Sequence, residues 1–388
     1  MVGPPACLDR MSVSGQVRQQ FCFHTQRSNC DLMAKKAHAP NNPNAPKKER
    51  APKDLSPRFG IGEWFGKSVT LMSGAERRAL AREVLKPKSE RASHPCPFQA
   101  TRPNAKCSKE GGVCSLRMYS LAKHPENGRA IGVPVEGPQG ELRATCPYRF
   151  HEAKTVFNWV GNVILGDSAP RLVGEVGFLE AGPTTDTSGG DDVGRIDMVL
   201  VSNNTEHNAS PIVWGALEIQ AVYFSGSAMR AEFKAYADES CDWVIFPAAK
   251  RRPDYRSSGP KRLMPQLQIK VPALRRWGRK MAVVVDQSFF DSIGEMDHVQ
   301  HISNSDIAWF TVGFEEVQGS TQMRLVPKNI RFTTLERAVE GLTGGKPVAL
   351  PLFEERIRSK IAQPASSSPV DATVVPESDT AESDAEEF

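Results

Sequence analysis

The sequence predicts an α/β fold in which a mixed β-sheet is flanked by helices. Two runs rich in β-branched and aromatic residues, 194–201 and 212–224, are joined by an Asn/Ser/Thr-rich connection, which is typical of neighbouring strands. A basic segment with helical spacing then leads into the apolar strand 281–285. This strand–helix–strand order is that of a parallel pair, so parallel and antiparallel strands share one sheet.

The composition fits a folded protein with a polyanionic partner. At 388 residues and 39% hydrophobic residues, the chain can form two ordinary domains or one large core, and no apolar run approaches a membrane span. Seven acidic residues and no Lys or Arg follow Lys360. Without those seven acids, 49 basic residues face 38 acidic ones. A basic body of this kind suits nucleic acid.

Four regions are expected along the chain. Residues 1–57 form a disordered basic tail, and 58–150 form an N-terminal region with a cysteine-rich part. Residues 151–361 form the core, and 362–388 form a disordered acidic tail. Cysteines without a recognisable signal peptide indicate a reducing cytoplasm.

Individual elements follow from local signals. Ser73 and Glu76 form a capping box that predicts a helix to Leu85. Glycine, proline and asparagine in 95–148 predict irregular structure, and Pro265 and Pro272 predict interruption of any long helix. Further strands are expected at 172–179, 306–315 and 330–332, and further helices at 149–165, 228–240, 287–293, 333–342 and 352–361.

Four cysteines could form a structural metal site: Cys96, Cys107, Cys114 and Cys146. Thiolates are soft ligands that suit tetrahedral zinc or a single iron. The nearby prolines and glycines allow a loop to wrap a metal. Disulfides and buried free thiols are the alternatives. His94 lies two residues from Cys96, and we expect no role for it because four thiolates already complete the site.

Two acids lie on the central predicted strands. Asp197 stands between Ile196 and Met198, and Glu218 precedes Ile219 and Gln220. A carboxylate in an apolar strand is costly unless its charge is compensated, and Mg²⁺ prefers such oxygen ligands. Asp followed by Glu-x-Lys is the active-site pattern of the PD-(D/E)XK nucleases, with Gln220 here at the lysine position. The alternative is a polar strand end with a solvated acid.

The segment 250–280 holds eleven Lys or Arg residues and one acid, Asp254. A surface helix usually carries both signs, so the bias favours contact with phosphates through counterion release. Arginines here could also be bidentate to guanine.

These motifs, in this order, resemble the NotI-type restriction endonucleases. The resemblance extends over Cys-Pro-Phe, Gly-Val-Cys, Cys-Pro-x-Arg and Gly-x-Leu-Glu-Ile-Gln. It implies a homodimeric, Mg²⁺-dependent endonuclease of double-stranded DNA with a PD-(D/E)XK core, a four-cysteine iron site and a long GC-rich palindromic target. The catalytic residues would be Asp197, Glu218 and Gln220, with Glu175, or alternatively Glu180, as a fourth carboxylate. Asp191 and Asp192 are more simply a solvated turn.

Asp197 and Glu218 would then ligate magnesium. Gln220 would orient water or phosphate, because an amide accepts no proton at neutral pH. The positive charge usually supplied by lysine must come from the metal or from the basic segment. Two other functions stay open: a less specific nuclease of the same fold in repair or phage defence, and a non-catalytic DNA-binding regulator built around the four-cysteine site.

Overall fold

The computed structural model describes residues 56–99, 102, 104–180, 192–203, 211–238, 240–344 and 348–362. The predicted tails 1–57 and 362–388 lie outside these residues apart from positions 56, 57 and 362. Asp191 also lies outside them, as do the side chains of Glu180 and Asp192. None of the helices in these ranges combines the length and apolar character needed to cross a membrane.

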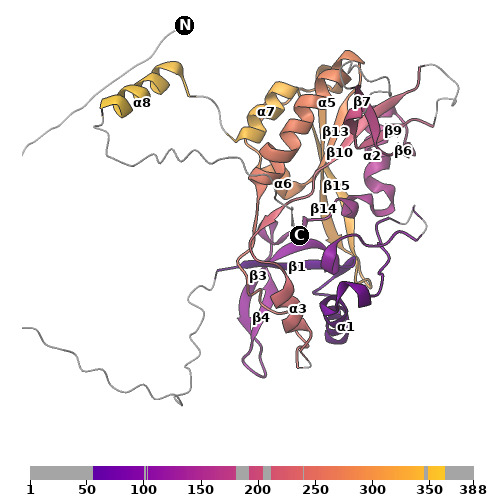
Figure 1. Ribbon diagram of the computed structural model, residues 1–388, viewed down its shortest axis with the longest axis vertical. Coiled ribbons are helices and arrows are strands. Elements are labelled where there is room, and N and C mark those ends of the chain that lie inside the picture. The colour runs from indigo at the N-terminus through magenta and orange to yellow at the C-terminus, as the bar shows by residue number, and fades with distance from the viewer. Residues whose placement is uncertain are drawn as a thin grey trace, which may run out of the picture. The chain divides into compact units, whose positions relative to one another are not determined.

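A mixed sheet of six strands forms the centre of the fold (Figure 1), which confirms the predicted α/β class. Strands β10, β13 and β14 are parallel, whereas β9, β6 and β15 join them in antiparallel pairs. In order across the sheet, the strands are β15 (Met323–Thr333), β14 (Ile307–Glu316), β13 (Met281–Asp286), β10 (Trp214–Ile219), β9 (Met198–Val201) and β6 (Arg171–Val173).

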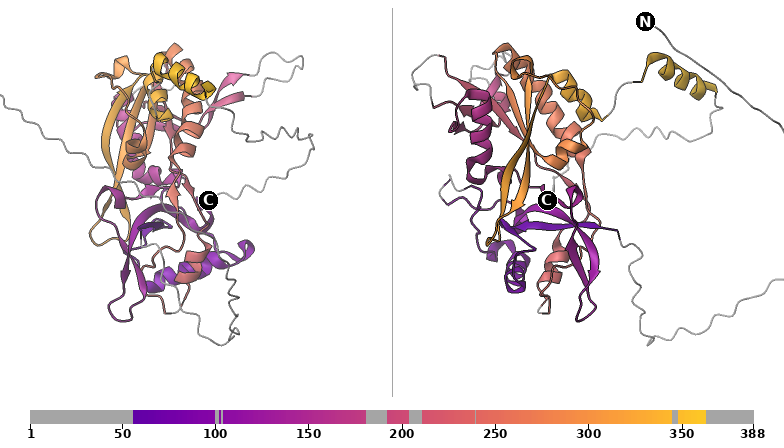
Figure 2. Two further views of the ribbon diagram at one scale, coloured as in Figure 1. Left: turned by 90° about the vertical axis from the view of Figure 1, so that its left-hand side faces the viewer. Right: turned by 180° about the vertical axis from the view of Figure 1, so that it is seen from behind.

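Helices cover both faces of this sheet (Figures 1 and 2). Side chains alternate along a strand, so Val283 packs with the α5 face and Val284 with the α2 face. The helices on the α5 face are α4 (Tyr255–Ser258), the π-helix η5 (Gly259–Leu263), α5 (Met264–Arg276), α6 (Gln287–Ser292) and α7 (Leu335–Thr343). The other face carries α2 (Thr155–Leu165), which follows the 3-10 helix η4 (Pro147–Lys154).

Two expectations for the core were wrong. Pro272 lies inside α5 and Pro265 in its first turn, so the prolines do not interrupt the helix. Packing of the apolar face of α5 against the sheet outweighs the hydrogen bond that Pro272 cannot make. The expected strand 172–179 is divided at Gly174 into β6 and β7 (Val176–Glu180), and β7 pairs with β8 (Asp192–Ile196) outside the central sheet.

The N-terminal region forms a second, antiparallel sheet of five strands. They are β1 (Arg58–Trp64), β2 (Lys67–Ser68), β3 (Val113–Lys123), β4 (Ala130–Pro134) and β5 (Arg143–Ala144). The expectation of irregular structure over 95–148 was therefore wrong for β3, β4 and β5. Gly111 and Gly112 both have positive φ, so these glycines mark the sharp turn that leads into the strand.

Helix α1 (Gly74–Leu85) begins at the predicted capping box. The Ser73 hydroxyl accepts a hydrogen bond from the backbone N–H of Glu76, at 3.2 Å, and the Glu76 carboxylate accepts one from the backbone N–H of Ser73. Because both donors at the helix start are satisfied, the local sequence alone determines where this helix begins.

A later segment completes the core of the N-terminal sheet. After β10 the chain forms β11 (Phe224–Ser225) and α3 (Arg230–Tyr236), and it returns through β12 (Arg252–Pro253). Phe233 and Tyr236 of α3 pack against Trp64 of β1, with ring centroids 5.2 and 5.9 Å away. Both sheets belong to one compact unit, Asp54–Phe388. The last described helix, α8 (Leu350–Ala362), is exposed along its length.

Candidate active site and nucleic-acid cleft

The two predicted acids meet at one end of the central sheet. Asp197 occupies the bend between β8 and β9, and Glu218 lies near the end of β10. Strands β9 and β10 pair with Met198 opposite Leu217, so the register places Asp197 beside Glu218. Glu218 is 7% exposed, whereas the Asp197 side chain is 52% exposed. The pair thus has one buried oxygen donor group and one that faces solvent.

A lysine from α5 joins these two carboxylates. The Lys270 ammonium lies 2.9 Å from Glu218 Oε2 and 3.4 Å from Asp197 Oδ2, and Lys270 is only 2% exposed. From the sequence, Lys270 was predicted only to be one of eleven basic residues in its segment. Its position in the helix distinguishes it from the other basic residues, because Lys270 falls in the same helical stripe as Leu267, Val271 and Leu274. A lysine in an apolar stripe indicates a buried charge partner.

The environment makes Glu218 a weak acid. Burial is the largest cause that raises the pKa of Glu218, Lys270 opposes the rise and the charge of Asp197 adds to it, and the result is a pKa of about 7. In the absence of a metal, Glu218 therefore gains a proton close to neutral pH. A divalent ion that binds there must displace this proton.

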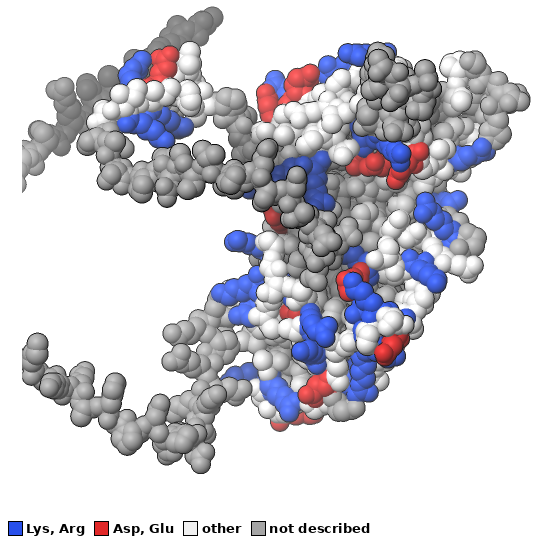
Figure 3. Space-filling model, viewed as in Figure 1, with Lys and Arg blue, Asp and Glu red and all other residues white. Residues whose placement is uncertain are grey.

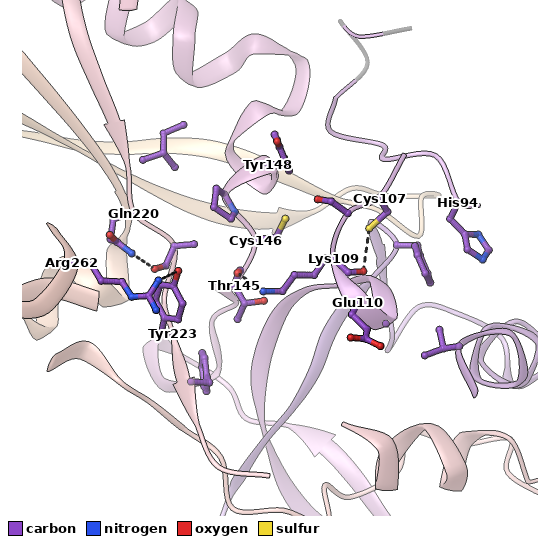
Figure 4. Close-up of a pocket in the computed structure, with 18 of the residues that line it drawn as sticks. His94, Cys107, Lys109, Glu110, Thr145, Cys146, Tyr148, Gln220, Tyr223 and Arg262 are labelled. Carbon is purple, nitrogen blue, oxygen red and sulfur yellow. Dashed lines mark hydrogen bonds between the residues drawn. The ribbon is translucent and has the colours of Figure 1, made fainter. Parts of the chain in front are cut away.

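Gln220 lies directly after β10 and is buried. Its backbone N–H donates to Val284 O at 3.0 Å, and its amide Nε2 donates to Ala221 O at 2.7 Å. The first contact anchors the backbone and the second fixes the side chain in the wall of a large cleft, which Glu218 also lines (Figure 4). The geometry suits a group that orients a bound molecule by hydrogen bonds.

The predicted fourth carboxylate, Glu175, lies just before β7. Glu175 is exposed and forms an ion pair with Arg195 of β8, at 3.0 Å. Strands β7 and β8 pair with Val176 opposite Ile196. This strand pairing brings the backbone of Glu175 toward Asp197, but the Glu175 carboxylate pairs with Arg195. A catalytic role for Glu175 stays a prediction.

A cleft of about 1500 Å³ lies between the end of β10 and the cysteine region. Figure 4 shows Gln220 and Arg262 on one side of it and Cys107 and His94 on the other. Five basic residues line it: Lys88, Arg91, Lys109, Lys261 and Arg262. Three acids line it as well, Glu83, Glu110 and Glu218. Blue Lys and Arg patches also outnumber red ones on the face shown in Figure 3.

The basic residues of the segment 250–280 differ in their surroundings: some line the cleft and others form structural ion pairs. Lys261 and Arg262 are its only basic residues that line this cleft, within the described part of the chain. The guanidinium of Arg262 stacks over the Tyr223 ring at 3.6 Å and donates to its hydroxyl. Arg251 is buried against Glu232 at 2.7 Å. Sequence counting could not separate cleft residues from such structural ion pairs.

The four predicted metal cysteines gather in one region. Cys96 and Cys107 lie on a two-stranded loop, in which Cys107 N donates to His94 O at 2.8 Å. Cys114 lies in β3, and Cys146 follows β5 and donates its N–H to Cys114 O at 3.3 Å. The pairing of β3 with β5 thus links the last two cysteines.

These thiols are free and mostly buried. Burial is the main cause that raises the pKa values of Cys107, Cys114 and Cys146, and the neighbouring thiols raise them further. In the part of the chain that the structure describes, no three His, Cys, Asp or Glu side chains are arranged to hold a metal ion together. The backbone assembles the four cysteines without closing a metal cage, and the iron or zinc site stays a prediction.

A buried arginine connects the cysteine region to both sheets. Arg149 Nε donates to Glu63 Oε2 of β1 at 2.8 Å, and its Nη2 donates to Met323 O of β15 at 3.0 Å. The guanidinium also lies 4.4 Å from the ring of Phe98 and 4.6 Å from that of Phe314. Arg149 belongs to the Cys-Pro-x-Arg motif, so the motif includes a structural cation as well as a cysteine.

Comparison with known proteins points to one family. A family model described as restriction endonuclease NotI matches residues 79–325, well over half of the chain. The matched range includes the four cysteines, both acids and Lys270. No curated protein matches the chain.

Proposed function

Since the chain belongs to the restriction endonuclease NotI family, we propose that it cuts double-stranded DNA at a specific site with magnesium held by Asp197 and Glu218. The observation that carries this proposal is the meeting of these two carboxylates, from the bend between β8 and β9 and from β10, where Glu218 lines a basic cleft. Members of a restriction endonuclease family hydrolyse phosphodiester bonds, and that reaction needs compensation of developing negative charge.

The donor set fits magnesium. Mg²⁺ is usually held by one or two carboxylates, together with water and substrate phosphate. A site of this kind needs no third protein acid, so the absence of a three-residue metal group among the described residues does not conflict with it. When bound, the ion would polarise the scissile phosphate and lower the pKa of its bound water.

The residues around the ion have separate tasks in this proposal. Asp197 and Glu218 supply oxygen ligands, and ligation keeps Glu218 ionised despite its burial. Gln220 orients the water or the phosphate by hydrogen bonds, since its amide cannot act as a base. The cations Lys88, Arg91 and Lys109 line the same cleft as Gln220, where they would contact the DNA backbone.

We further propose that the four cysteines hold a structural iron or zinc. Their convergence from one loop, from β3 and from the segment after β5 supports this, because burial disfavours the free thiolates and a metal would compensate them. The bound metal would fix the wall of the cleft opposite Gln220. A homodimer acting on a GC-rich palindrome follows from the family resemblance, since a two-fold symmetric target matches a two-fold symmetric protein.

Digestion of DNA of known sequence tests the function. The purified full-length chain is incubated with MgCl2, with and without EDTA, and the ends of the products are mapped. Discrete fragments with common ends support site-specific cleavage. Binding that retards DNA without cutting it would identify a regulator instead, and a smear or scattered nicks would identify a less specific nuclease.

A further inference from the structure

We infer that Lys270 supplies, from helix α5, the positive charge that Gln220 cannot give to the reaction. In the metal-free protein the same ammonium holds Asp197 and Glu218 together. This inference rests on the proposed function, because it assigns a residue to the same active site.

Stability alone does not explain a lysine at this position. Lys270 is 2% exposed and lies in a stripe with Leu267 and Val271. A buried ion pair is weak evidence for a stabilising role, because replacing both of its partners by well-packed apolar residues is often neutral or stabilising.

The contacts show what the charge does. Lys270 Nζ reaches one oxygen of each carboxylate, at 2.9 and 3.4 Å, so a single ammonium bridges both. Lysine is a compact point charge on a flexible stem, which lets it shift when another cation takes up the same oxygens. Asp197 is half-exposed, so the bridge has an open side toward solvent.

The shifted ammonium has a chemical task in hydrolysis. The water oxygen bonds to phosphorus, the bond from phosphorus to one sugar oxygen breaks, and a water proton ends on that leaving oxygen. Negative charge accumulates on the phosphate oxygens before that bond is broken. The Lys270 ammonium beside the carboxylates stabilises this charge. In a Glu-x-Lys pattern, the lysine two residues after the glutamate would do so from the strand.

The test combines cleavage with metal binding. Lys270→Met should slow DNA cleavage about 100-fold or more, the scale of losing one electrostatic donor from an active site. It should also tighten Mn²⁺ binding to the DNA-free protein at pH 8 severalfold, read by electron paramagnetic resonance, because a competing positive charge is removed. A merely structural lysine would leave Mn²⁺ binding unchanged or weaken it.

Charge relocation provides a second variant. Gln220→Lys combined with Lys270→Met places the lysine at the strand position and should recover cleavage about tenfold over Lys270→Met alone. Lys270→Arg should retain more activity than Lys270→Met. If Lys270→Met does not fold, these two variants decide the matter: the inference is overturned if the double variant folds and does not cleave.

Two controls separate this inference from the proposed function. Lys234→Met removes one exposed charge from α3, away from the cleft, and should cut DNA as the unaltered protein does. Asp197→Ala tests the site itself. Loss of cleavage in Asp197→Ala with full cleavage in Lys270→Met overturns the role of Lys270 and leaves the function standing. Full cleavage in Asp197→Ala overturns both.

Discussion

The carboxylate site and the cysteine cluster solve the same electrostatic problem in opposite ways. Each gathers acidic groups that are distant in sequence and that range from buried to about half-exposed. At the carboxylates, the chain supplies its own counter-charge through Lys270. At the cysteines, the effect of Lys109 on the thiol pKa values is opposed by burial and by the other thiols. The first site is therefore stable before a metal arrives, whereas the second needs a metal to ionise.

The difference predicts that metal serves chemistry at one site and folding at the other. A divalent ion at Asp197 and Glu218 would replace an existing charge and change the reaction rate. A metal at the four cysteines would replace protons and stabilise the fold. Substitutions at the two sites should thus affect different measurements.

The largest effect is expected at the carboxylates. Asp197→Ala or Glu218→Ala should reduce cleavage by roughly 10³-fold or more, because the magnesium ligands are lost. DNA binding should remain, since the cleft cations are unchanged. Cleavage assays and gel-shift assays on the same preparations check this. Cleavage by either variant at the unaltered rate would contradict the assignment.

At the cysteines, metal content should change instead. Cys114→Ser should lower the iron or zinc content measured by elemental analysis and lower the melting temperature. Cys241→Ser is the matched control, because Cys241 is also a buried free thiol and lies outside the four-cysteine region. Equal metal content in both variants would remove the case for a four-thiolate site.

The buried arginine that joins the cysteine region to both sheets should affect stability. Arg149→Met leaves Glu63 buried without its cation and should cost about 3–5 kcal/mol of unfolding free energy. Arg195→Met breaks only the exposed pair with Glu175 and should cost about 1 kcal/mol or less. Urea denaturation measures both losses of unfolding free energy. Similar values would show that the buried Arg149–Glu63 pair stabilises the protein no more than the exposed Arg195–Glu175 pair.

The smallest effect is a pH dependence of magnesium affinity. Since the pKa of Glu218 is raised to about 7, protons compete with the metal below that value. The apparent affinity should fall about tenfold per pH unit below pH 7 and level off above it. Without metal, the sign for stability is reversed: the contribution of protonated Glu218 is lost as pH rises from about 4.5 to about 7. Metal titrations from about pH 5.5 to about pH 8.5, a range that spans this pKa, check the first statement.

Sequence patterns predicted those parts of the molecule that depend on local signals. The capping box at Ser73 determined the start of α1, and the apolar run at 281–285 identified the central strand β13. The pairing of Asp197 with Glu218 also followed, because two strands joined by a turn fix their register. Strand β3 was missed because the glycines before it were interpreted as a loop.

Lys270 was missed for a different reason. Its partners lie 52 and 73 residues earlier in the sequence, and composition counted it with surface charges. Only the helical phase, which places it among leucines, distinguishes it from the exposed basic residues of the segment. Charges that belong to a site can therefore be found by asking which of them break an apolar stripe.

The return of α3 to the N-terminal sheet sets a limit on how the protein can be made and divided. The aromatic wall behind Trp64 is finished only by Phe233 and Tyr236, which are translated long after β1. The core of the N-terminal sheet is therefore complete only after α3 has been synthesised. A fragment that ends near residue 150 would contain all four cysteines but would lack the α3 side chains of this core. The cysteine region therefore cannot be transferred to another protein without α3.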